Sequence, residues 1–399
     1  MLNRVSAILA ALSVLVCLIS CERDESSTEG QGTGRFISFT TVEDSVWPDM
    51  TKGAISNVGD LLGDGFSIWA SWVKDPLDRI VYGEEYYSRG VNGAVFGESG
   101  TVVTATDMDD DGKFVQTKDA WTYSPQQEWY RGYYSFAAAI PASAFKKNDG
   151  VTGIHYKHSD VSTDLTYAGG KVIGITYNNR LTLDFPDNIF VLGGHSTNGT
   201  KLPLSVQPDL MYAFAEVDNS GNDAENVDLQ FNHTCAKLSI LLSVNDPTKT
   251  MNVQKITVYG LINSIPTPLV FERTNTEGRL TENSNFSSML EEAEKDSKTY
   301  RSTLDSPFAV FIRPEGEGDD AAKWDVKGSD AEKPVPVRLV EDLVVFPGKL
   351  STENQLKIKI DYKNGDDLLT TYVKISKGEW KAGQSYAYAF QADYASDNI

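Results

Sequence analysis

Short strand-like runs fill the sequence from residue 35 to the C-terminus and constrain the fold more than any other feature. Each run is rich in Val, Ile, Phe, Tyr, Thr or Trp and is bounded by Gly, Asn, Asp or Pro, as β-strands joined by turns are. The runs are 36–42, 66–73, 102–106, 113–117, 133–140, 181–185, 210–217, 227–231, 237–244, 253–261, 308–312, 343–346, 356–362, 369–375 and 385–394. Only 287–295 has a helical pattern. The sequence therefore predicts an all-β protein of the sandwich class with one short helix at most.

The 399-residue length is enough for about two domains. Nine polar residues at 218–226 separate two strong strand runs, so we place the domain boundary there. We expect an N-terminal β-sandwich over residues 36–222 and a C-terminal β-sandwich over residues 223–399. The charged, glycine-bearing stretch 314–336 is expected to be a long loop inside the second domain.

The N-terminus carries a targeting signal. Arg4 precedes an apolar run at 5–19 that ends in Ser20-Cys21, which resembles a bacterial lipoprotein signal peptide with its lipobox. We expect residues 1–20 to be the signal peptide, the cut to fall between Ser20 and Cys21, and Cys21 to carry the lipid. Residues 21–35 are polar and predict a flexible tether. The alternative is a secreted protein whose signal happens to end near a cysteine.

The charge balance limits the partners. The chain has 56 acidic and 36 basic residues, a net charge of −20, which disfavours nucleic acid and anionic lipid. No second apolar run approaches membrane-spanning length, so attachment to a membrane would depend on the lipid alone. The remaining cysteine, Cys235, lies in an apolar strand run and is predicted to be a small buried hydrophobe.

One acidic motif is a candidate metal site. Asp107, Asp109 and Asp111, followed by Gly112, have the spacing of a calcium-binding loop. However, the twelfth position of that loop is Lys118 where a glutamate is expected, and the flanking runs are strands. The alternative is an acidic hairpin turn, for which Asp-Asp-Gly is well suited. Calcium is thus a candidate ligand, and no other cofactor is predicted.

Nothing in the sequence indicates catalysis. No metalloprotease, nucleophile-elbow, P-loop or dinucleotide motif occurs, so we predict a protein that is not an enzyme. His155 and His158 lack further ligands at a recognisable spacing, and His233 is expected to be structural. The tryptophans could form a platform for sugar rings, although on strands such residues mostly pack in cores. They are Trp69, Trp72, Trp121, Trp129 and Trp380. A glycan-binding surface lipoprotein is therefore the alternative function.

Three blocks of sequence resemble a known family. They are Trp121-Thr-Tyr123-Ser-Pro125-Gln-Gln-Glu-Trp129 with the following 134–141; Asp209-Leu-Met-Tyr-Ala213 with 227–238; and Trp380-Lys-Ala-Gly383-Gln-Ser-Tyr386-Ala-Tyr388. The blocks are similar to the "W-Y-P-W … F-A-P", "D-L-x-Y-A … F-x-H-x-x-A-K" and "W-x-x-G-x-x-Y-x-Y" patterns of the fimbrillin-like lipoproteins, the Mfa-like type V pilins. They occur here in the family's order.

The resemblance implies two transthyretin-like β-sandwich domains in tandem and export to the cell surface as an outer-membrane lipoprotein. It also implies a role as a fimbrial subunit that contributes to adhesion, with other fimbrial subunits and a host protein or glycan as partners. Family pilins are activated when a trypsin-like protease removes an N-terminal strand and a neighbour's strand fills the groove. In this chain the removable strand would be 36–42.

The resemblance places the maturation cut after Lys52, where the family usually has arginine. Arg35 is an alternative site, but a cut there would leave the strand attached to the chain. After the last strand run only residues 395–399 follow, which at about 3.3 Å per residue is too short for a further donor strand. We therefore expect an accessory or tip subunit rather than a stalk pilin.

Overall fold

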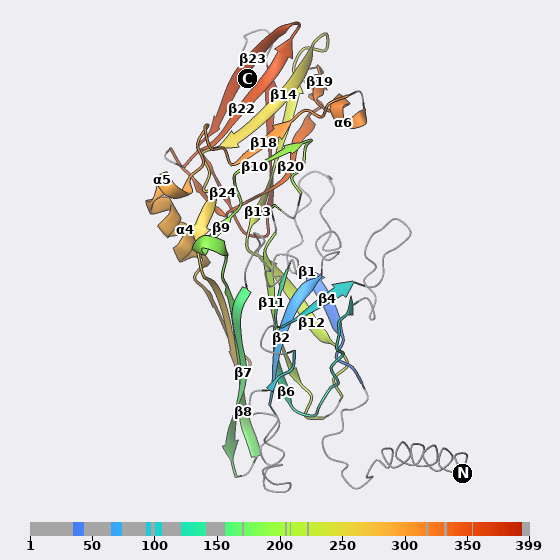
Figure 1. The fold of residues 1–399 in the computed structure, drawn as a ribbon, viewed down its shortest axis with the longest axis vertical. Helices are drawn as coiled ribbons and strands as arrows, with labels where there is room; N and C mark the ends of the chain where they lie inside the picture. The colour runs from blue at the N-terminus through green and yellow to red at the C-terminus, as the bar shows by residue number, and fades with distance from the viewer. Residues whose placement is uncertain are drawn as a thin grey trace, which may run out of the picture.

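The computed structural model describes residues 35–43, 65–73, 93–96, 100–105, 121–140, 156–169, 171–203, 206–207, 209–221, 223–316, 318–330, 333–352 and 354–392. Nearly all of the secondary structure in these residues is β-strand, which confirms the predicted all-β class. Figure 1 shows an elongated molecule in which most of the early strands lie in one half and most of the late strands in the other. None of the helices in these ranges is long and apolar enough to cross a membrane.

The largest sheet has the strand order β1-β12-β11-β6-β2-β4-β5, with β3 beside β2. Its strands are β1 (Phe39–Glu43), β2 (Phe66–Val73), β3 (Gly93–Ala94), β4 (Thr101–Ala105), β5 (Trp121–Thr122), β6 (Tyr133–Ile140), β11 (Met211–Asp218) and β12 (Val227–His233). β1 lies at the edge and runs parallel to β12, while β2, β6 and β11 pair antiparallel. We call this the N-terminal sheet.

A second layer packs against the N-terminal sheet. It has the order β17-β16-β8-β7 and consists of β7 (Tyr156–Ala168), β8 (Lys171–Leu183), β16 (Leu269–Thr276) and β17 (Arg279–Ser284). β7 and β8 contact β2 and β6, and the Ser135 hydroxyl donates to the carbonyl of Ser162 at 2.9 Å. The β16–β17 hairpin thus brings residues from the second half of the chain onto the first half.

The other half of the molecule contains two further sheets. One has the order β10-β18-β14-β22-β23 with β19 beside β14, and the other has the order β20-β13-β25. Their strands are β10 (His195–Asn198), β13 (Ala236–Val244), β14 (Thr250–Tyr259), β18 (Ala309–Ile312), β19 (Asp325–Lys327), β20 (Val337–Val345), β22 (Leu356–Asn364), β23 (Asp367–Ile375) and β25 (Ser385–Ala392). The buried side chains of both sheets belong to one hydrophobic cluster.

Short elements complete the described fold. β9 (Ile189–Val191) pairs with β15 (Ser264–Pro266), β21 (Gly348–Leu350) pairs with β24 (Gly378–Trp380), and η3 (Pro186–Asn188) is a single 3₁₀ turn. The helices are α4 (Phe286–Lys295), α5 (Ser297–Tyr300) and α6 (Asp319–Ala322). Helix α4 confirms the predicted helix, whereas α5 and α6 were not predicted.

Two stretches differ from what the sequence predicts. The stretch 314–336 was predicted to be a long loop, but within it α6 and β19 form, because Trp324 and Val326 are fully buried there. Most of the β7–β8 hairpin and of the β16–β17 hairpin was missed, since polar residues interrupt their strand patterns; all six residues of β17 are exposed. The predicted strand at 113–117 lies outside the described residues.

The polar stretch 218–226, where the sequence predicts a domain boundary, joins β11 to β12 within the N-terminal sheet. β10 comes from the first half of the chain and pairs with β18 from the second, just as β16 pairs with β8. Strands therefore cross between the halves in both directions. The tandem of domains at 36–222 and 223–399 stays a prediction.

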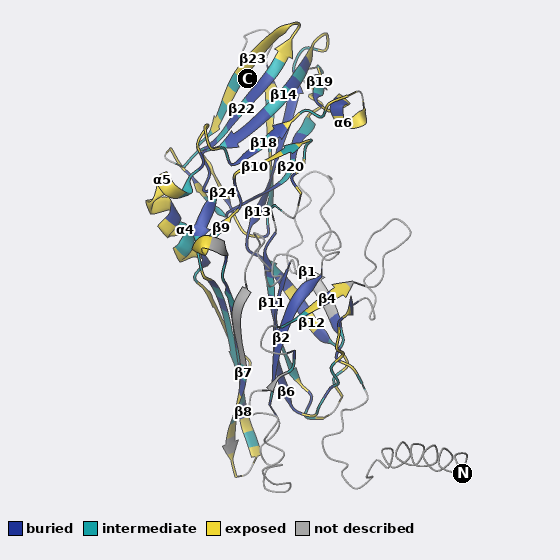
Figure 2. Cartoon of the chain, in the orientation of Figure 1, coloured by how far each residue is buried: buried dark blue, intermediate teal, exposed yellow. Residues whose placement is uncertain are grey.

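The apolar patterns explain which faces are buried. In β22 the alternate residues Leu356, Ile358 and Ile360 are fully buried, and the intervening lysines are partly exposed. β6 and β13 are buried at every position, which a strand requires when both faces of its sheet are covered. Figure 2 shows this burial along the centre of the molecule, with exposed residues on β23 and the tips of the hairpins.

Candidate functional site: the N-terminal strand and the core beneath it

The segment 35–39 is held by backbone hydrogen bonds to two separate parts of the chain. The amide of Ile37 donates to the carbonyl of Gln127 at 2.8 Å, and the amide of Trp129 donates to the carbonyl of Arg35 at 2.9 Å. One residue further on, the amide of Val227 donates to the carbonyl of Ser38 at 2.8 Å. The segment therefore lies first beside residues 127–129 and then, as it continues into β1, beside β12.

Side chains of this segment fill an aromatic core. Phe39 is completely buried, with its ring centroid 5.6 Å from that of Phe66 and 5.7 Å from that of Tyr123. Phe96 and Phe136 lie at 6.1 Å and 6.5 Å. Ile37 is buried in the same cluster. Fully burying one such side chain stabilises the fold by about 1.5–3 kcal/mol, so this short segment contributes several kcal/mol through two residues.

The first family-like block supplies further side chains of this core. Trp121, Tyr123 and Trp129 are all buried in the cluster that contains Phe39. The Tyr123 hydroxyl donates to the carbonyl of Ile37 at 2.8 Å. Burial raises the pKa of Tyr123 to about 12, against the opposing effect of its bond to Gln127, so the hydroxyl stays protonated and able to donate. We call these three side chains, together with the backbone groups at 127–129 and in β12 that bind residues 35–38, the β1 seat.

The geometry defines what would happen if residues 35–43 were withdrawn. Several aromatic side chains would face water, and the amides of Trp129 and Val227 and the Tyr123 hydroxyl would lose their acceptors. Unpaired backbone groups beside an apolar channel are the features that another extended strand can satisfy. A replacement strand would need apolar side chains at the positions of Ile37 and Phe39.

The second family-like block forms a buried charged cluster where β12 meets β13. Oδ2 of Asp209 accepts a hydrogen bond from Nδ1 of His233 at 3.0 Å and lies 3.2 Å from Nζ of Lys237. All three side chains are at most 5% exposed. This confirms the prediction that His233 is structural. Asp209 and Lys237 belong to the second block, but the sequence predicts no contact between them; a lysine inside an apolar strand run was the available signal.

The electrostatic environment determines the protonation state of Asp209 and of the nearby Cys235. Burial alone would raise the pKa of Asp209, but the charge of Lys237 and the hydrogen bond from His233 outweigh it and hold the pKa below its ordinary value. Asp209 is therefore ionised in the folded protein at neutral pH. Burial and the nearby Asp209 raise the pKa of the Cys235 thiol far above its usual range, so this cysteine is an unreactive hydrophobe, as predicted.

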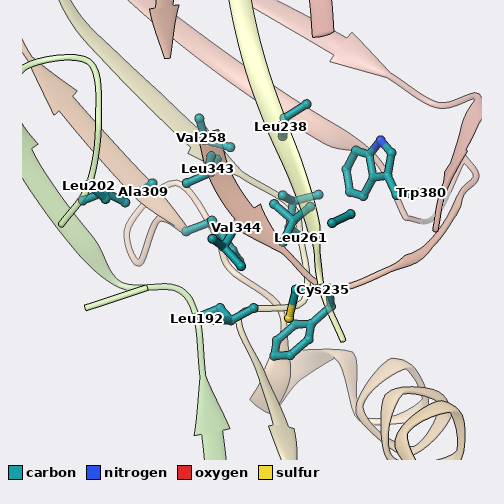
Figure 3. Packing of buried hydrophobic residues seen from close by; sticks show 14 of the residues in the cluster. Leu192, Leu202, Cys235, Leu238, Val258, Leu261, Ala309, Leu343, Val344 and Trp380 are labelled. Atoms are coloured by element: carbon teal, nitrogen blue, oxygen red, sulfur yellow. The ribbon is translucent and has the colours of Figure 1, made fainter. Parts of the chain in front are cut away.

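The third family-like block packs beside the second. The amide of Gly383 donates to the carbonyl of Cys235 at 2.9 Å, and Nε1 of Trp380 donates to the Tyr388 hydroxyl at 3.1 Å. Figure 3 shows Cys235 and Trp380 in one cluster with Leu238 and Leu261. The blocks that carry the family resemblance thus have packing roles.

The tryptophans named in the sequence pack in cores, as is usual on strands, and do not form the alternative sugar-binding platform. Trp69, Trp121, Trp129 and Trp380 are all buried, and Trp72 is partly buried. Stacking on a sugar needs an exposed ring face, which buried indoles do not offer. Within the described ranges, no group of three or more His, Cys, Asp and Glu side chains could hold a metal ion.

Most sequence-predicted site residues lie outside the described residues. These are Ser20 and Cys21 of the lipobox, Lys52 of the maturation site, and Asp107, Asp109 and Asp111 of the calcium motif. Arg35 is described, and it lies directly before the strand, with its carbonyl bound by Trp129. Lys52 falls between β1 and β2 in sequence, so a cut after it would separate β1 from the rest of the chain.

Comparison with known proteins supports the resemblance over the second half of the chain. Residues 205–397 match the model of the fimbrillin-like family. This range contains the second and third blocks, including Asp209, His233 and Trp380. The resemblance inferred from the sequence is therefore confirmed for this range. No curated protein matches the chain.

Several solved structures are distantly similar to this chain. A candidate cell adhesion protein from Bacteroides ovatus is 12% identical with a TM-score of 0.40, covering 90% of this chain and 91% of that chain. A candidate cell adhesion protein from Bacteroides fragilis is 11% identical with a TM-score of 0.36, covering 90% and 94%. The fimbrial anchor protein Mfa2 from Porphyromonas gingivalis is 10% identical with a TM-score of 0.23, covering 82% and 78%. TM-scores this low carry no inference about this chain.

Replacing Phe39 by alanine tests the energetic role of the β1 seat. Because Phe39 is fully buried, we expect Phe39→Ala to lower the free energy of unfolding by about 3–5 kcal/mol in urea titrations. Phe36 is the matched control, since it is 47% exposed and its removal should cost about 0.5 kcal/mol or less. Equal losses for the two variants would contradict the seat described here.

Replacing Asp209 by asparagine tests the buried cluster. At pH 7 the variant leaves Lys237 as a buried charge without its carboxylate, so we expect a loss of about 3–5 kcal/mol. The folded pKa of Asp209 is lowered, so its contribution is present above the unfolded value of about 3.9 and is lost as pH falls further. The difference from wild type should shrink in acid. The exposed Asp367→Asn is the control, and a difference independent of pH would contradict the assignment.

Proposed function

We propose that this chain, whose residues 205–397 belong to the fimbrillin-like family, is a surface-exposed fimbrial or adhesin-type subunit. The observation that carries the proposal is the way the β1 seat is filled: Ile37 and Phe39, just before and at the start of the edge strand β1, are buried in an aromatic core otherwise built from distant parts of the chain. Such an arrangement suits a strand that a neighbouring subunit can replace. A structural role also agrees with the packing roles of the family-like blocks.

Strand exchange in this proposal follows from simple energetics. While β1 remains covalently attached, its high local concentration keeps the seat filled and excludes a strand from another subunit. Once β1 is separated by proteolysis it can dissociate, and the seat then exposes aromatic surface and unpaired amides. A neighbour's strand with apolar residues in the positions of Ile37 and Phe39 would restore both sets of contacts.

The maturation site of the proposal is Lys52. A cut after Lys52 would leave all of residues 35–43 on the released fragment, whereas a cut after Arg35 would leave β1 joined to β2 through the chain. Only the first cut therefore frees the seat. The departure from the family's usual arginine still leaves a basic residue of the kind that a trypsin-like protease recognises.

Delivery to the surface belongs to the same proposal. The lipobox at Ser20 and Cys21 would place the chain in the outer membrane through lipid on Cys21, with the tether 21–35 ahead of β1. Cleavage at Lys52 would release the body of the protein from that anchor together with the strand. We also propose an accessory or tip position, which long filaments composed only of this chain in the electron microscope would contradict.

N-terminal sequencing of material from intact cells tests the mechanism. For the wild-type chain we expect a mature N-terminus at Gly53 and a ladder of oligomers, because removal of β1 exposes the seat. For Lys52→Gln we expect intact, lipidated chain and no ladder. Arg35→Gln is the matched control, since it removes a basic residue beside β1 and should leave the Gly53 terminus and the ladder unchanged.

Two outcomes would contradict the mechanism. If the wild-type chain is recovered only intact and lipidated, proteolysis does not activate it. If oligomers form equally with Lys52→Gln, assembly does not need release of β1. A separate measurement of labelling with radioactive fatty acid in Cys21→Ala distinguishes failed lipidation from failed cleavage, because only lipidation depends on Cys21.

A further inference from the structure

The outward face of three strands at the edge of one sheet has an unusual set of side chains. In β14, β22 and β23 the inward positions, such as Ile256, Ile358 and Ile360, are buried in the core. The outward positions form four rows across the strands: Tyr259, Lys357 and Lys374; Thr257, Lys359 and Tyr372; Lys255, Asp361 and Thr370; and Asn252, Lys363 and Leu368. We call this surface the basic face.

The side chains of the basic face are neighbours in the structure. Nζ of Lys357 lies 5.9 Å from the ring centroid of Tyr259. Burial and the nearby Tyr372 raise the pKa of Tyr259, against the opposing effect of Lys359. The rows are about 7 Å apart and the strands about 5 Å apart. Tyrosine rings and ammonium groups therefore share one small area on adjacent strands.

The acidic residue among the outward positions, Asp361, already forms hydrogen bonds within the face. Asp361 is largely buried, and its carboxylate accepts hydrogen bonds from Lys359 at 3.1 Å and from the Thr370 hydroxyl at 2.6 Å. Beside the face, Asp325 binds Arg313 through both oxygens, at 2.6 Å and 3.0 Å. Asp366 and Asp367 lie beyond the last row, at the β22–β23 turn. The lysines thus dominate the potential over the centre of the face.

This charge is opposite to that of the rest of the chain. The outward positions carry five lysines and one aspartate, a net charge of +4, so the remainder of the −20 chain carries −24. At physiological salt, charges interact over about 8 Å. A ligand at the basic face therefore experiences mainly its lysines, and the overall negative charge does not prevent local binding of an anion.

We propose that the basic face binds a polyanionic polysaccharide, one bearing sulfate or uronate groups along its chain. The lysines supply ammonium groups at repeated spacings, which suit a polymer with charges repeated along its length. Tyr372 is 51% exposed and provides a ring face on which a sugar ring can stack between the charged contacts, while Tyr259 is partly buried beneath Lys357. The aromatic component favours a polysaccharide over an acidic protein segment, which would need the lysines alone.

The position of the face agrees with an external ligand. β23 is the edge strand of its sheet and is mostly exposed, and Figure 2 shows the exposed residues along it. In Figure 1 β22 and β23 lie at the end of the molecule opposite to β2 and β6. This assignment extends the proposed surface role by naming a ligand class. It does not depend on strand exchange, since the face is complete within one chain.

Binding to immobilised heparin, a sulfated polysaccharide, at 0.15 M salt tests the assignment. We expect the purified chain to bind heparin and not its desulfated, N-acetylated form. Lys357→Gln with Lys374→Gln should weaken binding about tenfold, and this pair leaves Asp361 with its partners. The matched control is Lys295→Gln with Lys298→Gln, which removes the same charge from exposed positions on α4 and α5 and should leave binding unchanged.

A second comparison separates sugar recognition from charge alone. Tyr372→Ala should weaken heparin binding severalfold without changing binding of polyglutamate, because only the sugar stacks on the ring. Thermal melting of every variant checks that the fold is intact. Equal loss in the control lysine pair, absence of heparin binding, or polyglutamate binding as tight as heparin binding would each overturn the assignment. Release of β1 and oligomer formation are measured separately, so either proposal can fail alone.

Discussion

The fold depends on a sheet that is apolar on both of its faces. In β6 the small residues Ala137 and Ala139 pack into one hydrophobic cluster, while Phe136, Ala138 and Ile140 pack into another on the opposite face. Both faces must be covered, since exposing either would place a large apolar surface in water. The first face is covered by β7, β8 and β16. The second is covered by loops of the first half of the chain and by the segment that carries Ile37 and Phe39.

The need to cover both faces of this sheet explains why the short segment with Ile37 and Phe39 is important for the stability of the fold. The cover of the first face is a four-stranded sheet with contributions from both halves of the chain, so no single cut could remove it. The cover of the second face includes the edge strand β1, which the chain joins to β2 through residues 44–65. The same burial that stabilises the folded chain therefore creates, at the β1 seat, a place that a different strand could occupy.

The buried cluster of Asp209, His233 and Lys237 has a different role in the architecture. It lies where β12 of the N-terminal sheet continues into β13 of the other half, beside the start of β25. A buried ion pair contributes little net stability compared with apolar packing, but it tolerates few alternative arrangements because each charge needs its partner. The cluster thus connects Asp209, which precedes β11, to the residues at which β12 ends and β13 begins.

The strand pattern of the sequence determined much of this fold. The runs 66–73 and 133–140 coincide with β2 and β6, and the apolar residues that alternate in the run 356–362 are the ones buried in β22, because side-chain periodicity is a local property of the chain. The burial of Cys235 also followed from its apolar neighbours. The strands β7, β16 and β17 were not predicted, since polar residues occupy most of their positions and the strands they pair with are not evident from the local sequence.

Identifying the functional surfaces required both the sequence and the tertiary structure. The sequence determined that 36–42 is a strand with apolar residues, and through family resemblance that it is a candidate for removal. Only the tertiary structure decided that it pairs in parallel with β12, nearly 190 residues away, and that the Trp121–Trp129 block lies beneath it. Likewise, no local pattern brings Tyr259 next to Lys357. Such contacts depend on which strands pair and in which register, and these are decided by the burial of the whole core rather than by any short stretch of sequence.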